Sequence, residues 1–298
     1  MQLLVFLLAY PFIWLVSKLP FPLLYLLSDM VYVLVYRIFG YRKKVVRANL
    51  KLAFPEKHHD EIRILEKKFY KHMCDMFLEM VKTMGMSVET MRKRFHVTNP
   101  ELINSLAAKN RSTVLFAGHY ASWEWLLGIN TQLTPQPMAI YQKINNRYFD
   151  NLIKKIRGTY GTDLIKTNES RKIIAQMVAE KKTFVLGIAS DQSPMMNRTR
   201  HWAKFMDVMV PIHVGGEELC KKHDLVPIFL KVKKLKRGYY EASFEVISEN
   251  PKEVADYDIS ETFMKRLEGS IREAPEYYFW THKRWKHRNK VPKELAVL

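Results

Sequence analysis

Arg111-Ser-Thr-Val-Leu-Phe-Ala-Gly-His-Tyr-Ala-Ser-Trp-Glu-Trp125 contains the features that most constrain the predicted fold of this chain. Residues 113–117 form a short apolar run whose β-branched and aromatic side chains favour a strand. Gly118 ends the run, and His119 follows it directly. Residues 120–129 then carry apolar side chains on one side of a helical repeat. The stretch therefore predicts a strand, a turn that holds His119, and a helix.

His119 and Glu124 are a candidate general-base pair. The histidine would take a proton from a hydroxyl, while the carboxylate fixes the imidazole tautomer and stabilises the imidazolium. Residues five apart in a straight helix are rotated by roughly 140°, so the two side chains meet only if His119 lies in the turn. The spacing also argues against a zinc-binding helix. The alternative is a structural histidine at a strand end and a solvent-facing Glu124.

Strand-like and helix-like segments alternate along the chain on both sides of this stretch. This alternation predicts an α/β fold with a mixed β-sheet flanked by helices, because the last two strands form an antiparallel pair. We expect strands at 113–117, 136–141, 163–165, 183–188, 208–211, 226–232 and 239–247. We expect helices at 56–84, 121–130, 147–159, 171–179 and 259–271, one that ends at 222, and one that starts within 275–286.

Residues 1–40 form a separate apolar segment, interrupted at Pro11 and at 18–22. Neither half has the ~20 uninterrupted apolar residues that a membrane-spanning helix prefers. No basic region opens the segment and no small-residue cleavage site follows its first half, which argues against a signal peptide. We expect an N-terminal membrane anchor at 1–40 whose first half inserts and whose second half lies near the interface. A buried hairpin of a soluble domain is the alternative.

The net charge of +18 requires an anionic partner, such as a nucleic acid, an anionic membrane or an acidic protein. A basic cluster within 42–51 follows the anchor, which places 41–298 on the cytoplasmic side and suits anionic headgroups. The chain has no readable nucleic-acid motif, so we expect no nucleic-acid partner. Cys74 and Cys220 have no metal-binding spacing, and a reducing compartment is the default.

Four blocks of sequence occur in an order that is typical of one family. They are Arg47-Ala-Asn-Leu50 with Phe54-Pro-Glu56, then Gly118 to Glu124, then Ala189-Ser-Asp-Gln-Ser-Pro194, then Glu276-Tyr-Tyr-Phe-Trp-Thr-His-Lys-Arg-Trp-Lys286. The chain resembles the late acyltransferases of lipid A biosynthesis, the lauroyl and myristoyl transferase family, within the glycerolipid-type H-x4-D/E acyltransferases. The resemblance covers nearly the whole chain.

This resemblance implies a membrane-associated O-acyltransferase with its catalytic domain at 41–298, on the cytoplasmic face of the cell inner membrane. The donor would be acyl carrier protein, and the acceptor a hydroxyl of a lipid A precursor. Neither a cofactor nor a metal is implied. No nucleophilic serine is needed, and the chain has no G-x-S-x-G motif. Two alternatives remain: a transferase with another lipid acceptor, such as a lysophospholipid or an aminolipid, and a non-enzymatic basic membrane or nucleic-acid binder.

The resemblance also implies roles for residues outside the motif. Arg157 would stabilise the oxyanion beside the His119 and Glu124 pair, although a surface arginine on a basic helix is the alternative. Asp191 and Gln192 follow a strand at the edge where α/β sites open, with an Asx turn as the alternative. A basic loop within 198–204 could hold a phosphate. The expected substrate-binding residues are Tyr141, Asn145, Asp191, Gln192, Arg198, Arg200, His282 and Arg284, of which His282 is also a second candidate base.

Overall fold

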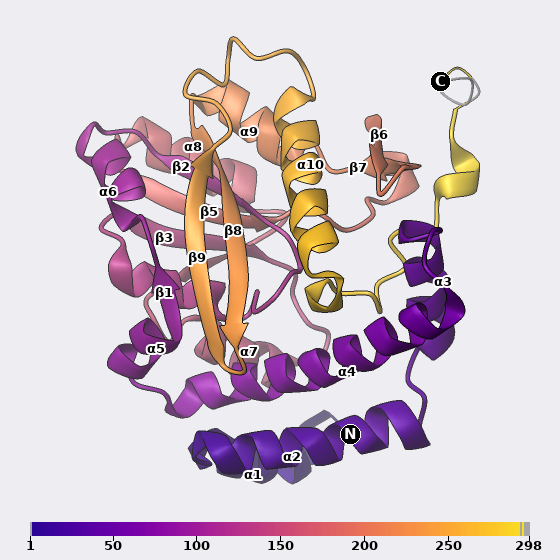
Figure 1. Cartoon of the computed structure of the whole chain (residues 1–298). Coiled ribbons are helices and arrows are strands. Elements are labelled where there is room, and N and C mark those ends of the chain that lie inside the picture. The colour runs from indigo at the N-terminus through magenta and orange to yellow at the C-terminus, as the bar shows by residue number, and fades with distance from the viewer. Residues whose placement is uncertain (1, 293, 295–298) are drawn as a thin grey trace.

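Residues 2–292 and 294, which the computed structural model describes, contain a seven-stranded mixed sheet (Figure 1). Its strand order is β1-β9-β8-β2-β5-β3-β4, and β1 and β9 run opposite to the other five. The strands are β1 (Phe95–Val97), β2 (Thr113–Ala117), β3 (Gln136–Tyr141), β4 (Asp163–Lys166), β5 (Phe184–Ala189), β8 (Val226–Lys236) and β9 (Tyr239–Val246). A second antiparallel pair is formed by β6 (His201–Phe205) and β7 (Val208–Ile212). The predicted fold class is confirmed.

Helices flank this sheet. Helices α9 and α10 pack against β8, and α4 runs along the lower margin of the sheet in Figure 1. The α-helices are α1 (Gln2–Lys18), α2 (Phe21–Tyr32), α3 (Lys43–Ala53), α4 (His59–Lys82), α5 (Val88–Arg94), α6 (Pro100–Ala108), α7 (Arg147–Arg157), α8 (Ser170–Ala179), α9 (Gly215–His223) and α10 (Asp258–Glu273). The π-helix is η1 (Val33–Ile38), and the 3₁₀ turns are η2 (Thr83–Gly85), η3 (Trp125–Gln132), η4 (Met196–Arg198), η5 (Pro275–Tyr277) and η6 (Arg288–Lys290).

The register of the two central strands positions the candidate site. All five residues of β2 are buried, as expected for a strand that is covered on both faces. β2 pairs with β5 in parallel, with Ala117 opposite Ala189. Two residues beyond this pair, the chain reaches His119 just after β2 and Asp191 just after β5. The carboxyl ends of two neighbouring strands therefore bring these two side chains to the same edge of the sheet.

The helix that we expected at 121–130 is not an α-helix. Ala121 has a φ of 51°, in the left-handed region, and η3 begins only at Trp125. The Ala121 N–H donates to the Tyr277 carbonyl at 3.0 Å, and Tyr120 forms a β-bridge with Tyr278. Within the turn the backbone hydrogen bonds span only two or three residues, as from the Tyr120 N–H to the Gly118 carbonyl and from the Trp125 N–H to the Ser122 carbonyl, so these contacts with a distant segment replace a regular α-helix. Residues 275–286 form η5 and turns instead of the helix that we expected, because the backbone of Tyr277 and Tyr278 takes part in these contacts.

The apolar N-terminal segment lies along α4, and α1 and α2 are drawn below that helix in Figure 1. Among the described residues, one helix, Phe21–Ile38, is long and apolar enough to cross a membrane, by length and composition only. This is the second half of the segment, whereas we expected the first half to insert. Large apolar side chains on both halves are more than half exposed: Leu4, Leu8, Phe12, Leu26, Ile38 and Phe39.

A buried carboxylate ties this segment to the sheet. Asp75 on α4 accepts hydrogen bonds from Ser28 on α2 at 2.7 Å and from Arg237 in the turn between β8 and β9 at 2.7 Å. Arg237 also donates to Asp29 at 2.7 Å, and the Lys234 ammonium lies 3.8 Å from Asp75. Asp75 therefore lies beside two cations and links α4 to α2 and to the turn between β8 and β9.

The Asp75→Ala variant is expected to unfold more easily, by about 2–3 kcal/mol, because removing one partner leaves buried polar groups unpaired. Denaturant titration in detergent measures this. Asp256→Ala is the matched control, since Asp256 is 83% exposed in its ion pair with Lys221 and its loss should cost less than about 1 kcal/mol. Equal unfolding midpoints for the two variants would show that the cluster does not hold the segment.

Candidate active site

His119 sits in the turn that follows β2, and a close approach of α10 shapes this turn. A Cβ atom on Gly118 would lie 2.5 Å from Leu267 Cδ1, so only glycine allows the contact. The His119 carbonyl accepts a hydrogen bond from the Phe279 N–H at 3.1 Å. The C-terminal block that resembles a family signature therefore fixes the backbone on which the histidine stands.

The His119 imidazole is held by two side chains from the end of β5. Its Nδ1 lies 2.7 Å from Asp191 Oδ1, and its Nε2 lies 3.2 Å from the Gln192 side-chain nitrogen. Asp191 is wholly buried. A carboxylate can only accept, so in the neutral ring the proton lies on Nδ1, and the Nε2 lone pair accepts from the Gln192 amide. This is the arrangement of a general base held in one tautomer.

Glu124 is bonded to Arg157 and not to the imidazole. Arg157 donates to the two carboxylate oxygens of Glu124 at 2.8 and 3.2 Å, which makes a bidentate pair. The Arg157 side chain is 29% exposed and the Glu124 side chain 7%. The residue that contacts His119 Nδ1 is thus Asp191, which we expected among the substrate-binding residues. Glu124 acts on His119 through its charge, which contributes to raising the pKa of the imidazole.

Burial and the charge of the partner have opposite effects on the pKa values of His119 and Asp191. Burial is the largest single influence and disfavours the imidazolium, but the Asp191 carboxylate and, to a smaller extent, the Glu124 charge together raise the pKa of His119 above its ordinary value of 6.5. Burial likewise favours the neutral Asp191 carboxyl, and the neighbouring imidazole reverses this and lowers the pKa of Asp191. Asp191 is therefore a carboxylate at neutral pH, as a residue that stabilises an imidazolium must be.

Two expected substrate contacts from the C-terminal block lie inside the protein or bond to its backbone. Arg284 is fully buried and donates to the Pro211 carbonyl at 3.1 Å, so its position differs from the substrate contact that we expected. His282 Nε2 accepts from the Ser193 N–H at 3.3 Å, and burial lowers the pKa of His282 to about 4. His282 thus supports the loop that carries Asp191 and is a weak base.

The four other expected substrate-binding residues lie apart from the imidazole. Tyr141 is buried at the end of β3, and Asn145 is exposed in the loop before α7. Arg198 is exposed on η4, and Arg200 forms an ion pair with a carboxylate on α9. Within residues 2–292 and 294, none of the four is hydrogen-bonded to His119.

Three aromatic residues near the imidazole, Trp123, Phe279 and Phe77, form an aromatic wall that was not predicted from the sequence. Trp123 meets the His119 ring edge-on at 5.5 Å, and Phe279 stacks with it at 6.2 Å. These two rings lie 4.9 Å apart, and Phe77, which is 39% exposed, is 6.4 Å from Phe279. The three residues come from the motif, from the C-terminal block and from α4, and nothing in their spacing joins them.

A histidine at the carboxyl end of parallel strands, a buried carboxylate bonded to it and aromatic rings beside it form a site suited to general-base chemistry on an apolar substrate. A sequence model of the bacterial lipid A biosynthesis acyltransferases matches residues 2–287. The chain therefore belongs to the bacterial lipid A biosynthesis acyltransferase family and is an acyltransferase.

Two relatives illustrate the likeness. The chain is similar to the lipid A biosynthesis palmitoleoyltransferase of Escherichia coli (strain K12) and to the lipid A biosynthesis acyltransferase of Shigella flexneri. Each is 25% identical over 253 residues, which span 83% of this chain and 79% of the relative. The resemblance inferred from four sequence blocks is confirmed.

Proposed function

We propose that this protein transfers a fatty acyl chain from acyl carrier protein to a hydroxyl of a lipid A precursor, with His119 as the general base. The observation that carries the proposal is the His119 imidazole, with Nδ1 bonded to buried Asp191 and Nε2 bonded to a neutral amide. Family membership supplies the reaction class. In this proposal residues 1–40 are the membrane anchor and residues 41–298 the catalytic domain.

The proton path begins at His119 Nε2. The acceptor hydroxyl replaces the Gln192 amide and gives its proton to Nε2, while Asp191 stabilises the imidazolium that forms. The oxygen attacks the thioester carbonyl carbon, and a new C–O bond forms. The tetrahedral intermediate then breaks its C–S bond, and the imidazolium returns the proton to the departing thiolate. The products are an ester and a free thiol, and no covalent enzyme intermediate is required.

Arg157 is proposed to stabilise the oxyanion of that intermediate. Glu124 occupies two of the guanidinium N–H groups and leaves the others available to a developing negative charge. Because Glu124 is only 7% exposed, it holds Arg157 in one orientation before the substrate binds. Glu124 thus has two proposed roles. Its charge stabilises the His119 imidazolium, and its hydrogen bonds position Arg157.

The Glu124→Gln variant is expected to lower kcat about 10²-fold, because an amide cannot accept both hydrogen bonds from Arg157 and the guanidinium loses its fixed position. Steady-state acyl transfer measures this. Glu101→Gln on the exposed face of α6 removes the same charge far from the site and should behave as wild type. A kcat for Glu124→Gln close to that of the control would remove the Glu124 and Arg157 pair from the mechanism.

The donor and the location are inferred from charge. Acyl carrier proteins are acidic and lipid A precursors carry phosphates, so the net charge of +18 favours both. The basic residues of 42–51 directly follow the apolar segment, which favours the cytoplasmic face of the inner membrane. Arg198, which is exposed on η4, remains the proposed contact for a substrate phosphate.

A different lipid acceptor is the second candidate, since the aromatic wall formed by Trp123, Phe279 and Phe77 selects an apolar substrate and not a headgroup. An assay of acyl carrier protein donors of several chain lengths against a lipid A precursor, a lysophospholipid and an aminolipid separates the two. We expect transfer to the lipid A precursor. Unchanged lipid A acylation in a deletion strain would contradict the proposal.

The pH dependence of the reaction follows from the raised pKa of His119. A general base must be neutral, so kcat/KM should fall as the pH drops through the pKa of the free enzyme. We expect the midpoint of this acidic limb above pH 6.5, because Asp191 raises the pKa of the imidazole. A rate profile from mildly acidic to mildly alkaline buffers measures it, and a midpoint below pH 6.5 would contradict the assigned partner.

A further inference from the structure

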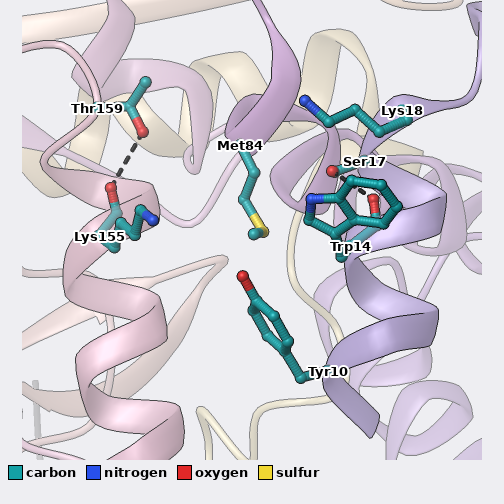
Figure 2. Close-up of a pocket in the computed structure, with 7 residues that line it drawn as sticks. All are labelled: Tyr10, Trp14, Ser17, Lys18, Met84, Lys155 and Thr159. Atoms are coloured by element: carbon teal, nitrogen blue, oxygen red, sulfur yellow. Dashed lines mark hydrogen bonds between the residues drawn. The ribbon is translucent and has the colours of Figure 1, made fainter.

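A cavity whose lining contains no residue of the His119 site lies between α1, η2 and α7. It has a volume of about 210 Å³, and its lining residues are Tyr10, Trp14, Ser17, Lys18, Met84, Lys155 and Thr159. Figure 2 shows Tyr10, Trp14 and Lys18 on one side and Lys155 with Thr159 on the other, with the Tyr10 hydroxyl directed into the space between them. A single water needs only about 10–15 Å³, so the cavity has room for a larger polar group.

The cavity carries positive charge and no carboxylate. Lys18 and Lys155 come from different helices, and within residues 2–292 and 294 neither forms an ion pair. A third cation, Lys82, donates to the carbonyl of Ser17, one of the lining residues, at 3.0 Å. Two lysines from separate elements thus line one cavity beside a phenol hydroxyl, and their ammonium groups are donors suited to an anion such as a phosphate.

The cavity also borders the apolar surface of α1. Leu4, Leu8 and Phe12 on this helix are 58–74% exposed, while Tyr10 and Trp14 turn towards the cavity. Tyr, Trp and Lys are the residues that gather at the boundary between hydrocarbon and headgroups. An anion bound between Lys18 and Lys155 would thus lie at headgroup depth when α1 rests on a bilayer.

We propose that this cavity binds the phosphate of an anionic lipid, as a site separate from the His119 site. The proposal rests on the membrane association included in the proposed function, but it does not depend on the acyl-transfer chemistry. Arg157, on the same helix as Lys155, is already bonded to Glu124 in the His119 site, so the two sites use different residues of α7. The phosphate could belong to a bilayer phospholipid or to the lipid acceptor, and the two sources give different results below.

The test compares vesicle binding by the full chain and three variants. Lys18→Gln/Lys155→Gln removes the cations, and Thr159→Trp fills the exposed mouth of the cavity without a change of charge. Lys172→Gln/Lys181→Gln is the control, because it removes the same two charges from exposed positions on and just after α8, outside the basic cluster that follows the anchor. Affinity is measured by flotation with phosphatidylglycerol–phosphatidylcholine vesicles and with phosphatidylcholine vesicles alone, on proteins with matched unfolding midpoints.

A bilayer phospholipid in the cavity predicts roughly tenfold weaker binding to the anionic vesicles for Lys18→Gln/Lys155→Gln than for the control, and a comparable loss for Thr159→Trp. A phosphate of the acceptor predicts instead an unchanged vesicle affinity and a roughly tenfold higher KM for the phosphorylated acceptor in the same two variants. Equal behaviour of all three variants in both measurements would overturn the proposal. Vesicle binding needs no acyl donor, so its failure is distinct from a failure of acyl transfer.

Discussion

The His119→Ala variant is expected to transfer acyl chains at least about 10²-fold more slowly than wild type, with its fold intact. The imidazole has Nδ1 bonded to a buried carboxylate and Nε2 as an acceptor, and the rings of Trp123 and Phe279 lie beside it. Its removal leaves the acceptor hydroxyl without a base, and at neutral pH a hydroxyl is a poor nucleophile.

The measurement is single-turnover transfer from an acyl carrier protein donor to the lipid A precursor. His223→Ala is the control, because His223 ends α9 far along the chain from the motif and has no role in the proposed mechanism. Unfolding midpoints of both variants establish that the fold survives. A His119→Ala rate within a few-fold of the control would exclude general-base catalysis by this residue.

The Asp191→Asn variant is expected to lose activity to a similar extent, by about 10²-fold or more, although it keeps the shape of the site. An asparagine can present its amide hydrogen to His119 Nδ1, which moves the imidazole proton to Nε2 and abolishes the lone pair that the substrate needs. The buried site also loses the negative charge that stabilises the imidazolium.

Asp191→Glu distinguishes the charge from the geometry. It keeps a carboxylate but displaces it by a methylene, so we expect partial activity, above that of Asp191→Asn. A merely structural role for Asp191 predicts the reverse order, because the isosteric amide disturbs the buried packing less than the longer acid does. Full activity of Asp191→Asn would return the role of the orienting carboxylate to Glu124.

Much of the sheet could be predicted from the sequence because its central strands are short, apolar and bounded by polar turns. The predicted limits of 113–117 and 136–141 coincide with β2 and β3. β1, at Phe95–Val97, was missed, since a strand of three residues has almost no periodicity to read. The expected helix at 121–130 failed for a different reason, because its backbone bonds to residues about 150 positions away.

The site was predicted in part. His119, Asp191 and Gln192 were all singled out, and Glu124 was paired with His119 because they share one motif. The structure pairs Glu124 with Arg157 instead, and Asp191 takes the place beside the imidazole. Sequence spacing describes only local neighbours, whereas the Asp191 contact depends on β2 and β5 being adjacent in the sheet. The order of strands, and not the motif, determines which carboxylate reaches the base.

The dependence of kcat/KM on pH, measured side by side for wild type and Asp191→Asn, shows whether Asp191 sets the pKa of His119. The wild-type acidic limb should have its midpoint above pH 6.5, because Asp191 raises the pKa of His119. The residual activity of the variant should show this limb displaced to lower pH, since burial then acts on the imidazole without the opposing carboxylate. Acidic limbs with the same midpoint in both proteins would contradict the claim that Asp191 orients and charges the catalytic histidine.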